Sequence, residues 1–174
     1  KNLGDLVDAI GIGFMFAPNY HPAMKFVAPV RKELEVRTIF NLLGPLTNPA
    51  SAKKQIIGVY SKELTLTFAK VLKELGSDHV LVVHGEDGMD EISITGNTYV
   101  AELKNNTITE YIINPEMFDL ERGALESIVV KDSSQSKKII LDILKGKSST
   151  GRDIILLNAG AAIYISGLAE DMKH

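Results

Sequence analysis

Two adjacent carboxylates, Asp90 and Glu91, are the side chains of this sequence best suited to holding a metal ion. They end the segment HGEDGMDE at residues 84–91, in which two glycines let the backbone turn sharply. Side-by-side carboxylates repel each other, and a cation relieves that repulsion. A solvated acidic turn is the commoner structure for such a dipeptide taken alone. Because Mg²⁺ commonly binds one or two carboxylates together with substrate phosphates, the pair also predicts a magnesium site beside a phosphorylated substrate.

Arg31 is a second residue with binding chemistry, since its planar guanidinium can grip a carboxylate or a phosphate through two hydrogen bonds. It lies on a segment whose apolar residues recur at helical spacing. The alternative is an exposed helix charge that pairs with Glu33 or Glu35. Taken alone, Arg31 favours this exposed-charge interpretation.

Two histidines complete the set of reactive side chains near these segments. His21 precedes Pro22, which suits the first turn of a helix, so His21 is an acid, a base or a ligand, or else a capping or packing residue. His84 ends a predicted strand, where it orients Glu86, contacts a substrate or packs. Three polar residues after the acidic pair either donate to phosphate oxygens or support a hairpin: Ser93, Thr95 and Asn97. No residue is assigned a catalytic role.

The elements that position the acidic pair form a predicted βαβ unit. Residues 55–60 and 78–84 are apolar strands, and residues 62–75 between them form an amphipathic helix closed by Gly76. The unbroken apolar run in the second strand is typical of a parallel strand covered on both faces. Ligands of open α/β sheets bind at the carboxyl ends of the strands, where residues 84–91 lie.

The remainder of the chain continues this α/β pattern. Residues 12–16 are expected to form a buried turn or short strand, and residues 44–49 a structured loop. A hairpin is predicted for residues 97–103 and 107–113 around Asn105-Asn106, followed by a short strand at 127–130. Helices are predicted for residues 133–144, with a Ser or Asp at its start, and for residues 152–166, capped by Ser149 or Thr150. We therefore expect a mostly parallel sheet flanked by helices, with a β-hairpin.

Composition excludes several function classes. The 174 residues carry a net charge of −3, which disfavours nucleic-acid binding, and contain no cysteine, which excludes disulfides and thiolate metal sites. No apolar run reaches membrane-spanning length, so no membrane partner is expected. The cysteine-free composition fits a reducing cytosol, and a cytoplasmic location is expected. Walker, GxSxG, HExxH and CxxC motifs are absent from the sequence.

Several segments of this sequence form an ordered set of longer motifs. The longest is RTIFNLLGPLTNP at residues 37–49. The others are residues 11–14, 16–18, 21–24, 30–31 and 84–91, with a weaker continuation to residue 174. Together, and in this order, they resemble the anthranilate phosphoribosyltransferase family across essentially the whole chain. The resemblance implies a domain of the nucleoside phosphorylase/phosphoribosyltransferase type.

The resemblance also implies a reaction and roles for named residues. Family members use Mg²⁺ and transfer the phosphoribosyl group of phosphoribosyl pyrophosphate to anthranilate, releasing pyrophosphate, in tryptophan biosynthesis. Residues matching Asp90 and Glu91 bind Mg²⁺ in the family, and the arginine matching Arg31 binds the carboxylate of anthranilate. A segment beside the anthranilate channel is matched by His21, Pro22 and Met24.

Other family features are missing from these residues. The Gly-Thr-Gly-Gly-Asp pyrophosphate loop, the Asn-x-Ser-Thr and Lys-His-Gly-Asn-Arg motifs, and the N-terminal helical domain with early sheet strands are not found. We expect residues 1–174 to be one incomplete α/β domain of a longer enzyme, truncated also at its C-terminal end. The parent is expected to be a homodimer through the helical domain, and the piece alone to be inactive.

Three alternatives compete with this interpretation. A pyrimidine nucleoside phosphorylase shares the fold type, but the acidic pair and Arg31 disfavour it. A related non-biosynthetic protein that binds nucleic acid needs a basic surface, which the net charge of −3 disfavours. A purely structural copy is disfavoured by the presence of Arg31, Asp90 and Glu91.

Overall fold

The computed structural model describes residues 3–20, 26, 33, 40–48 and 50–173. The chain divides into two compact units, Lys1–Ser51 and Ala52–His174. The first contains helices α1 (Leu3–Ile10), α2 (Ala17–Tyr20) and α4 (Phe40–Leu46). The second carries the sheet and the acidic pair. The expectation of one α/β domain over residues 1–174 stays a prediction.

Two local expectations for the first unit were wrong. Residues 12–16 were predicted as a buried turn or strand, but they form an irregular segment in which Phe14 is 81% exposed. Gly44 and Pro45 were predicted to belong to a loop, but they lie inside α4. Their helix-breaking tendencies are local preferences, which the surrounding structure can override.

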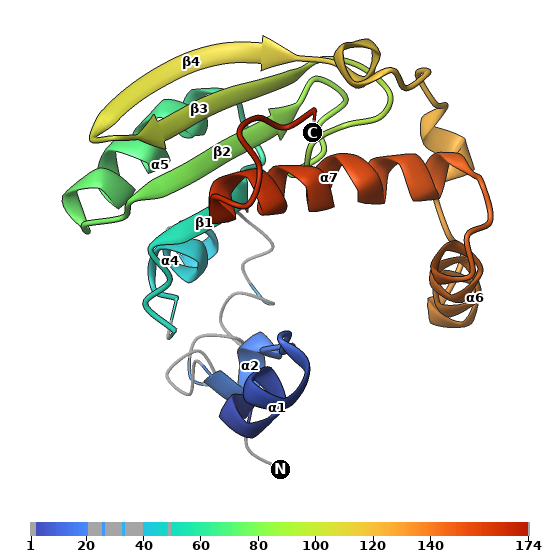
Figure 1. Cartoon of the computed structure of the whole chain (residues 1–174), viewed down its shortest axis with the longest axis horizontal. Coiled ribbons are helices and arrows are strands. Elements are labelled where there is room, and N and C mark those ends of the chain that lie inside the picture. Colours follow the sequence, from blue (N-terminus) through green and yellow to red (C-terminus); the bar gives the residue numbers. More distant parts are fainter. Residues whose placement is uncertain (1–2, 21–25, 27–32, 34–39, 49, 174) are drawn as a thin grey trace. The chain divides into compact units, whose positions relative to one another are not determined.

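The sheet of the second unit has four strands in the order β1-β2-β3-β4 (Figure 1). The strands are β1 (Lys54–Gly58), β2 (His79–Gly85), β3 (Thr98–Lys104) and β4 (Thr107–Ile113). The α/β class and the hairpin are confirmed. The sheet is less parallel than expected, since in the described residues β1–β2 is parallel and the other two pairings are antiparallel.

The β3–β4 hairpin turns at Asn105 and Asn106. Both residues have positive φ, of 51° and 60°. A two-residue hairpin with positive φ at both positions is a type I′ turn, and asparagine is among the residues that tolerate it best. The turn chemistry therefore explains why the sequence predicted this hairpin well.

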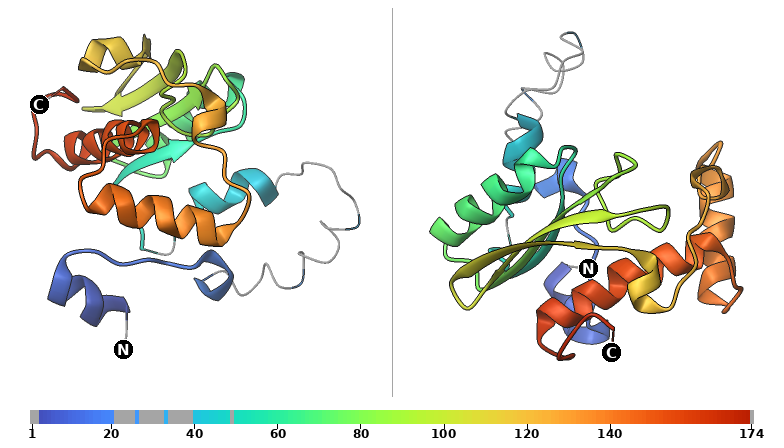
Figure 2. Two further views of the ribbon diagram at one scale, coloured as in Figure 1. Left: turned by 90° about the vertical axis from the view of Figure 1, so that its right-hand side faces the viewer. Right: turned by 90° about the horizontal axis from the view of Figure 1, so that it is seen from above.

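Helices cover both faces of the sheet (Figures 1 and 2). On one face, α5 (Glu63–Glu74) contacts β2, β3 and β4 and buries Phe68 and Leu72. On the other, α7 (Thr150–Ser166) contacts β1 and β2, and Leu157 packs in a cluster with Leu81 and Val83 of β2. Burial on both faces accounts for the continuous apolar run in β2.

Helix starts were predicted well at the C-terminal end of this unit. The Asp132 carboxylate accepts from the Gln135 N–H at 2.8 Å and caps α6 (Ser133–Leu144), and the Ser149 hydroxyl accepts from the Arg152 N–H at 3.1 Å and caps α7. The short strand expected at 127–130 was wrong. This part of the chain holds two 3₁₀ turns, η1 (Pro115–Phe118) and η2 (Leu125–Ser127), without a strand.

Glu102 on β3 joins α7 to the sheet. Its side chain is 12% exposed and accepts from His79 Nε2 at 2.8 Å, the Tyr164 hydroxyl at 2.7 Å and the Tyr111 hydroxyl at 2.9 Å. Partial burial raises the pKa of the Glu102 carboxyl, but the hydrogen bonds outweigh it and hold that pKa below its usual range. Burial and the charge of Glu102 raise the pKa of Tyr111, which keeps its phenol a donor.

This network predicts a loss of stability on acidification. A carboxyl whose folded-state pKa is depressed stabilises the fold fully above its unfolded-state value, about 4.3, and progressively less as pH falls through its folded-state pKa. We expect Glu102→Gln to lower the free energy of unfolding at pH 7 by about 2 kcal/mol. Urea unfolding at several pH values should show a shallower acid decline for this variant. Glu110→Gln, which changes an exposed acid of β4, is the control, and identical profiles for Glu102→Gln and wild type would contradict the prediction.

Candidate functional site

The acidic loop, residues 86–97, follows the carboxyl end of β2, as the sequence predicted. The Gly85 N–H donates to the Met89 carbonyl at 2.8 Å, and the Gly88 N–H donates to the Gly85 carbonyl at 2.9 Å. Gly88 has φ of +92°, a conformation that residues with a Cβ rarely adopt. These bonds form the tight turn that precedes the acidic pair.

Asp87 holds the interior of the acidic loop together. Its carboxylate accepts from the Met89 N–H at 3.0 Å, the Ser93 hydroxyl at 2.6 Å and the Thr95 hydroxyl at 2.5 Å. Partial burial raises the pKa of Asp87, but these bonds outweigh it and lower that pKa overall. Ser93 and Thr95 thus donate within the loop, and Asp87 is a positioning residue rather than a free metal ligand.

Two contacts fix the backbone on either side of Glu91. A Cβ at Gly58 on β1 would overlap the main-chain carbonyl of Asp90, so the loop lies directly against that strand. On the other side, Asn158 of α7 accepts from the Ile92 N–H at 3.0 Å and donates to the Ile92 carbonyl at 2.9 Å. The acidic pair is therefore held between β1 and α7.

The two acids themselves stay available to a ligand. Asp90 and Glu91 are both exposed. The pKa of the Glu91 carboxyl is raised, mainly because the carboxyl is partly shielded from water and also because the charged Asp90 lies next to it. A cation held by both carboxylates would offset the repulsion between them.

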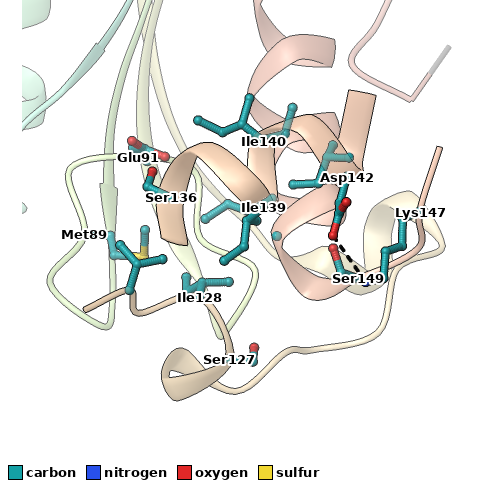
Figure 3. A pocket seen from close by; sticks show the side chains of 15 residues that line it. Met89, Glu91, Ser127, Ile128, Ser136, Ile139, Ile140, Asp142, Lys147 and Ser149 are labelled. Carbon is teal, nitrogen blue, oxygen red and sulfur yellow. Dashed lines mark hydrogen bonds and ion pairs between the residues drawn. The ribbon is translucent and has the colours of Figure 1, made fainter. Parts of the chain in front are cut away.

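Glu91 also reaches the rim of a pocket of about 430 Å³ between the acidic loop, α6 and α7 (Figure 3). The wall is dominated by isoleucines: Ile128, Ile139, Ile140, Ile143, Ile154 and Ile155. Lys147 is the basic side chain among the described lining residues, and its ammonium lies 3.3 Å from the Asp142 carboxylate. The pocket wall is thus mainly apolar, with Glu91 among its polar lining residues.

The donor set fits a cation that keeps waters or substrate oxygens. Within the described part of the chain, no group of three or more His, Cys, Asp or Glu side chains is placed to hold a metal. A closed protein cage is therefore not formed by these residues. Two exposed carboxylates match the way Mg²⁺ binds, through one or two carboxylates together with substrate phosphates and water.

The other predicted site residues cannot be placed beside this loop. Arg31, His21, Pro22 and Met24 lie outside the described residues. His84 is described, and its Nδ1 lies 2.8 Å from the Val59 carbonyl oxygen. Among the residues described, no helix is long and apolar enough to cross a membrane.

Sequence reasoning missed three residues that build the site: Gly58, Asp87 and Asn158. Asp87 carried a usable signal, because an Asp followed by Gly in a tight turn often accepts from the N–H two residues later. Gly58 and Asn158 act through contacts with residues 32 and 66 positions away in sequence. No local pattern reports such contacts.

Comparisons with known proteins agree with the fold. The sequence matches the family described as "Glycosyl transferase family, a/b domain" over residues 1–174. It is 58% identical over 167 residues to an anthranilate phosphoribosyltransferase from Methylobacillus flagellatus, covering 96% of this chain and 49% of that protein. The chain spans about half the length of the curated relatives it matches.

Solved structures show the same likeness. The anthranilate phosphoribosyltransferase from Thermus thermophilus is 41% identical with a TM-score of 0.90, covering 98% of this chain and 50% of that one. The Saccharomyces cerevisiae enzyme, solved in complex with phosphoribosyl pyrophosphate and Mg, is 32% identical with a TM-score of 0.82, covering 92% and 47%. The resemblance stated from the sequence is confirmed, and the chain belongs to the glycosyl transferase family, as its a/b domain.

Proposed function

We propose that the protein carrying this chain transfers the phosphoribosyl group of phosphoribosyl pyrophosphate to anthranilate. The products are N-(5-phosphoribosyl)anthranilate and pyrophosphate, in tryptophan biosynthesis. The observation that carries the proposal is the 58% identity to a named anthranilate phosphoribosyltransferase over 96% of the chain. The exposed carboxylate pair on a loop held by hydrogen bonds supports it.

The residues of the chain have distinct tasks in this proposal. Asp90 and Glu91 hold Mg²⁺, which when bound offsets the negative charge that develops on the departing pyrophosphate. Arg31 grips the anthranilate carboxylate through its guanidinium and so aims the amine. His21, Pro22 and Met24 line the approach of anthranilate. Positioning supplies much of the rate, so no strong base is assigned.

Three further properties accompany the proposal. The metal is Mg²⁺, which is named in the complex of the Saccharomyces cerevisiae relative. The protein acts in the cytoplasm, with anthranilate and phosphoribosyl pyrophosphate as its partners and without nucleic acid or membrane. It is a homodimer formed through a helical domain that these 174 residues do not include. These properties follow the family resemblance.

The test is a direct assay on the full product of the gene that encodes this chain. Anthranilate fluorescence should fall when phosphoribosyl pyrophosphate and Mg²⁺ are both supplied, and pyrophosphate should appear in equal amount. Omitting Mg²⁺ or adding a chelator should abolish the change. The 174-residue chain alone is expected to give none. Phosphate-dependent cleavage of a pyrimidine nucleoside in place of transfer would overturn the proposal.

A further inference from the structure

The parallel pairing of β1 with β2 ends in an irregular rung at Val59. The Val59 N–H donates to the Val83 carbonyl at 2.9 Å, which continues the ladder one residue beyond β1. In a regular parallel ladder, the Val59 carbonyl would then accept from the Gly85 N–H. The Gly85 N–H instead donates to the Met89 carbonyl and closes the acidic loop. The backbone donor of this rung has been diverted into the loop.

The imidazole of His84 takes the place of that diverted donor. Its Nδ1 lies 2.8 Å from the Val59 carbonyl oxygen. A carbonyl oxygen only accepts, so Nδ1 carries the hydrogen and donates. The side chain thereby satisfies a carbonyl that would otherwise lose its partner when the loop closes. The Gly85 N–H thus bonds within the acidic loop instead of to Val59, and the His84 side chain bonds to Val59 in its place.

The ring of His84 is held in this position by the neighbouring strand. Tyr99 on β3 is the cross-strand partner of His84, and the two rings stack at a centroid distance of 6.5 Å with an interplanar angle of 14°. The Lys62 ammonium lies 4.1 Å from the centroid of the Tyr99 ring. The direction of the Nδ1–H is therefore set by packing rather than by the hydrogen bond alone.

The strand end that His84 secures is the one that supports the acidic pair. Gly58, adjacent to Val59, lies directly against the main-chain carbonyl of Asp90. A shift of Val59 would move Gly58 and loosen this contact. A continuous path thus runs from the His84 imidazole through Val59 and Gly58 to the backbone of Asp90.

We infer that His84 is a positioning residue for the metal-binding pair, acting through the Nδ1–H that replaces the diverted rung. The inference rests on the proposed function for its effect on Mg²⁺, while the hydrogen-bond exchange is a property of the chain itself. His84 touches neither metal nor substrate in this account. Its role is to allow the Gly85 N–H to close the loop without leaving the Val59 carbonyl unpaired.

Three substitutions of His84 separate the position of the hydrogen-bond donor from the presence of the ring. His84→Asn keeps a donor near the place of Nδ1, His84→Gln moves it to the place of Nε2, and His84→Phe keeps the ring without a donor. In the full gene product, Gln and Phe should raise the Mg²⁺ concentration for half-maximal activity about 10- to 100-fold, as loss of supporting hydrogen bonds around metal ligands typically does. Asn should stay near wild type, and the KM for anthranilate should stay unchanged in all three.

A second measurement is independent of activity. Two-bond ¹⁵N–¹H correlations on the 174-residue chain should show that His84 carries its hydrogen on Nδ1. Hydrogen exchange of the Gly85 amide should be slow in the wild type and in His84→Asn, and faster in His84→Gln and His84→Phe. If wild type lacks transferase activity, these readouts still judge the hydrogen-bond exchange separately from the proposed function. A hydrogen on Nε2 alone, or equal behaviour of Asn, Gln and Phe, would overturn the inference.

Discussion

Replacing Asp90 by Asn or Glu91 by Gln in the full gene product should reduce Mg²⁺-dependent transfer by roughly 100-fold or more. Metal stabilisation of a developing negative charge contributes several kcal/mol, and each 1.36 kcal/mol is a factor of about ten in rate. Both substitutions keep the size of the side chain and remove its charge. The structure predicts little loss of stability, because both side chains are exposed.

The measurement is the rate of anthranilate consumption across a Mg²⁺ titration. Both variants should need more Mg²⁺ and reach a lower maximum. Glu86→Gln is the matched control, because it removes the same charge from an exposed residue of the same loop. Near-normal activity of the Asp90 and Glu91 variants, or an equal loss in the control, would remove the acidic pair from the proposed metal site.

Gly58→Ala is expected to have the second large effect, on both stability and metal binding. The added Cβ would overlap the Asp90 carbonyl, a main-chain atom that cannot rotate away as a side chain could. Overpacking typically costs about 1–3 kcal/mol, and the rigid obstacle places this substitution near 3 kcal/mol. The overlap can be relieved only if the acidic loop moves away from β1. The Mg²⁺ concentration needed for half-maximal activity should therefore rise as well.

Gly96→Ala is the control for Gly58→Ala. Gly96 lies in the acidic loop. A Cβ there would meet its nearest neighbour, the Glu86 carboxylate, at 3.6 Å, which is an ordinary contact. Urea unfolding and Mg²⁺ titration of both variants make the comparison. A Gly58→Ala protein with the stability and Mg²⁺ requirement of wild type would show that the loop does not depend on its contact with β1.

The elements around the site were predictable because their signals are local. The apolar run of β2, the amphipathic pattern of residues 62–75 and the capping residues Asp132 and Ser149 each act within a few positions. The Asn105-Asn106 turn is equally local. These signals placed the acidic pair at the carboxyl end of a strand, which is where the structure has it.

The support of the site was not predictable, since it depends on contacts between distant residues. Nothing near Gly58 in sequence indicates that the Asp90 carbonyl lies against it. Asn158 sits inside a helix as an ordinary polar residue, and only the fold reveals its pairing with both backbone groups of Ile92. The acidic dipeptide alone favoured a solvated turn. The other family-like segments, which occur in the same order as in the family, favoured the metal site.

In the proposed function, Asp90 and Glu91 hold the metal beside the pyrophosphate of the substrate. A crystal structure of the full gene product with phosphoribosyl pyrophosphate and Mn²⁺ would test this placement, because Mn²⁺ shares the oxygen ligands of Mg²⁺ and scatters anomalously. We expect an anomalous peak on the order of 2 Å from carboxylate oxygens of both residues and in contact with a phosphate oxygen. A peak bound to the phosphates with both carboxylates turned away would contradict it.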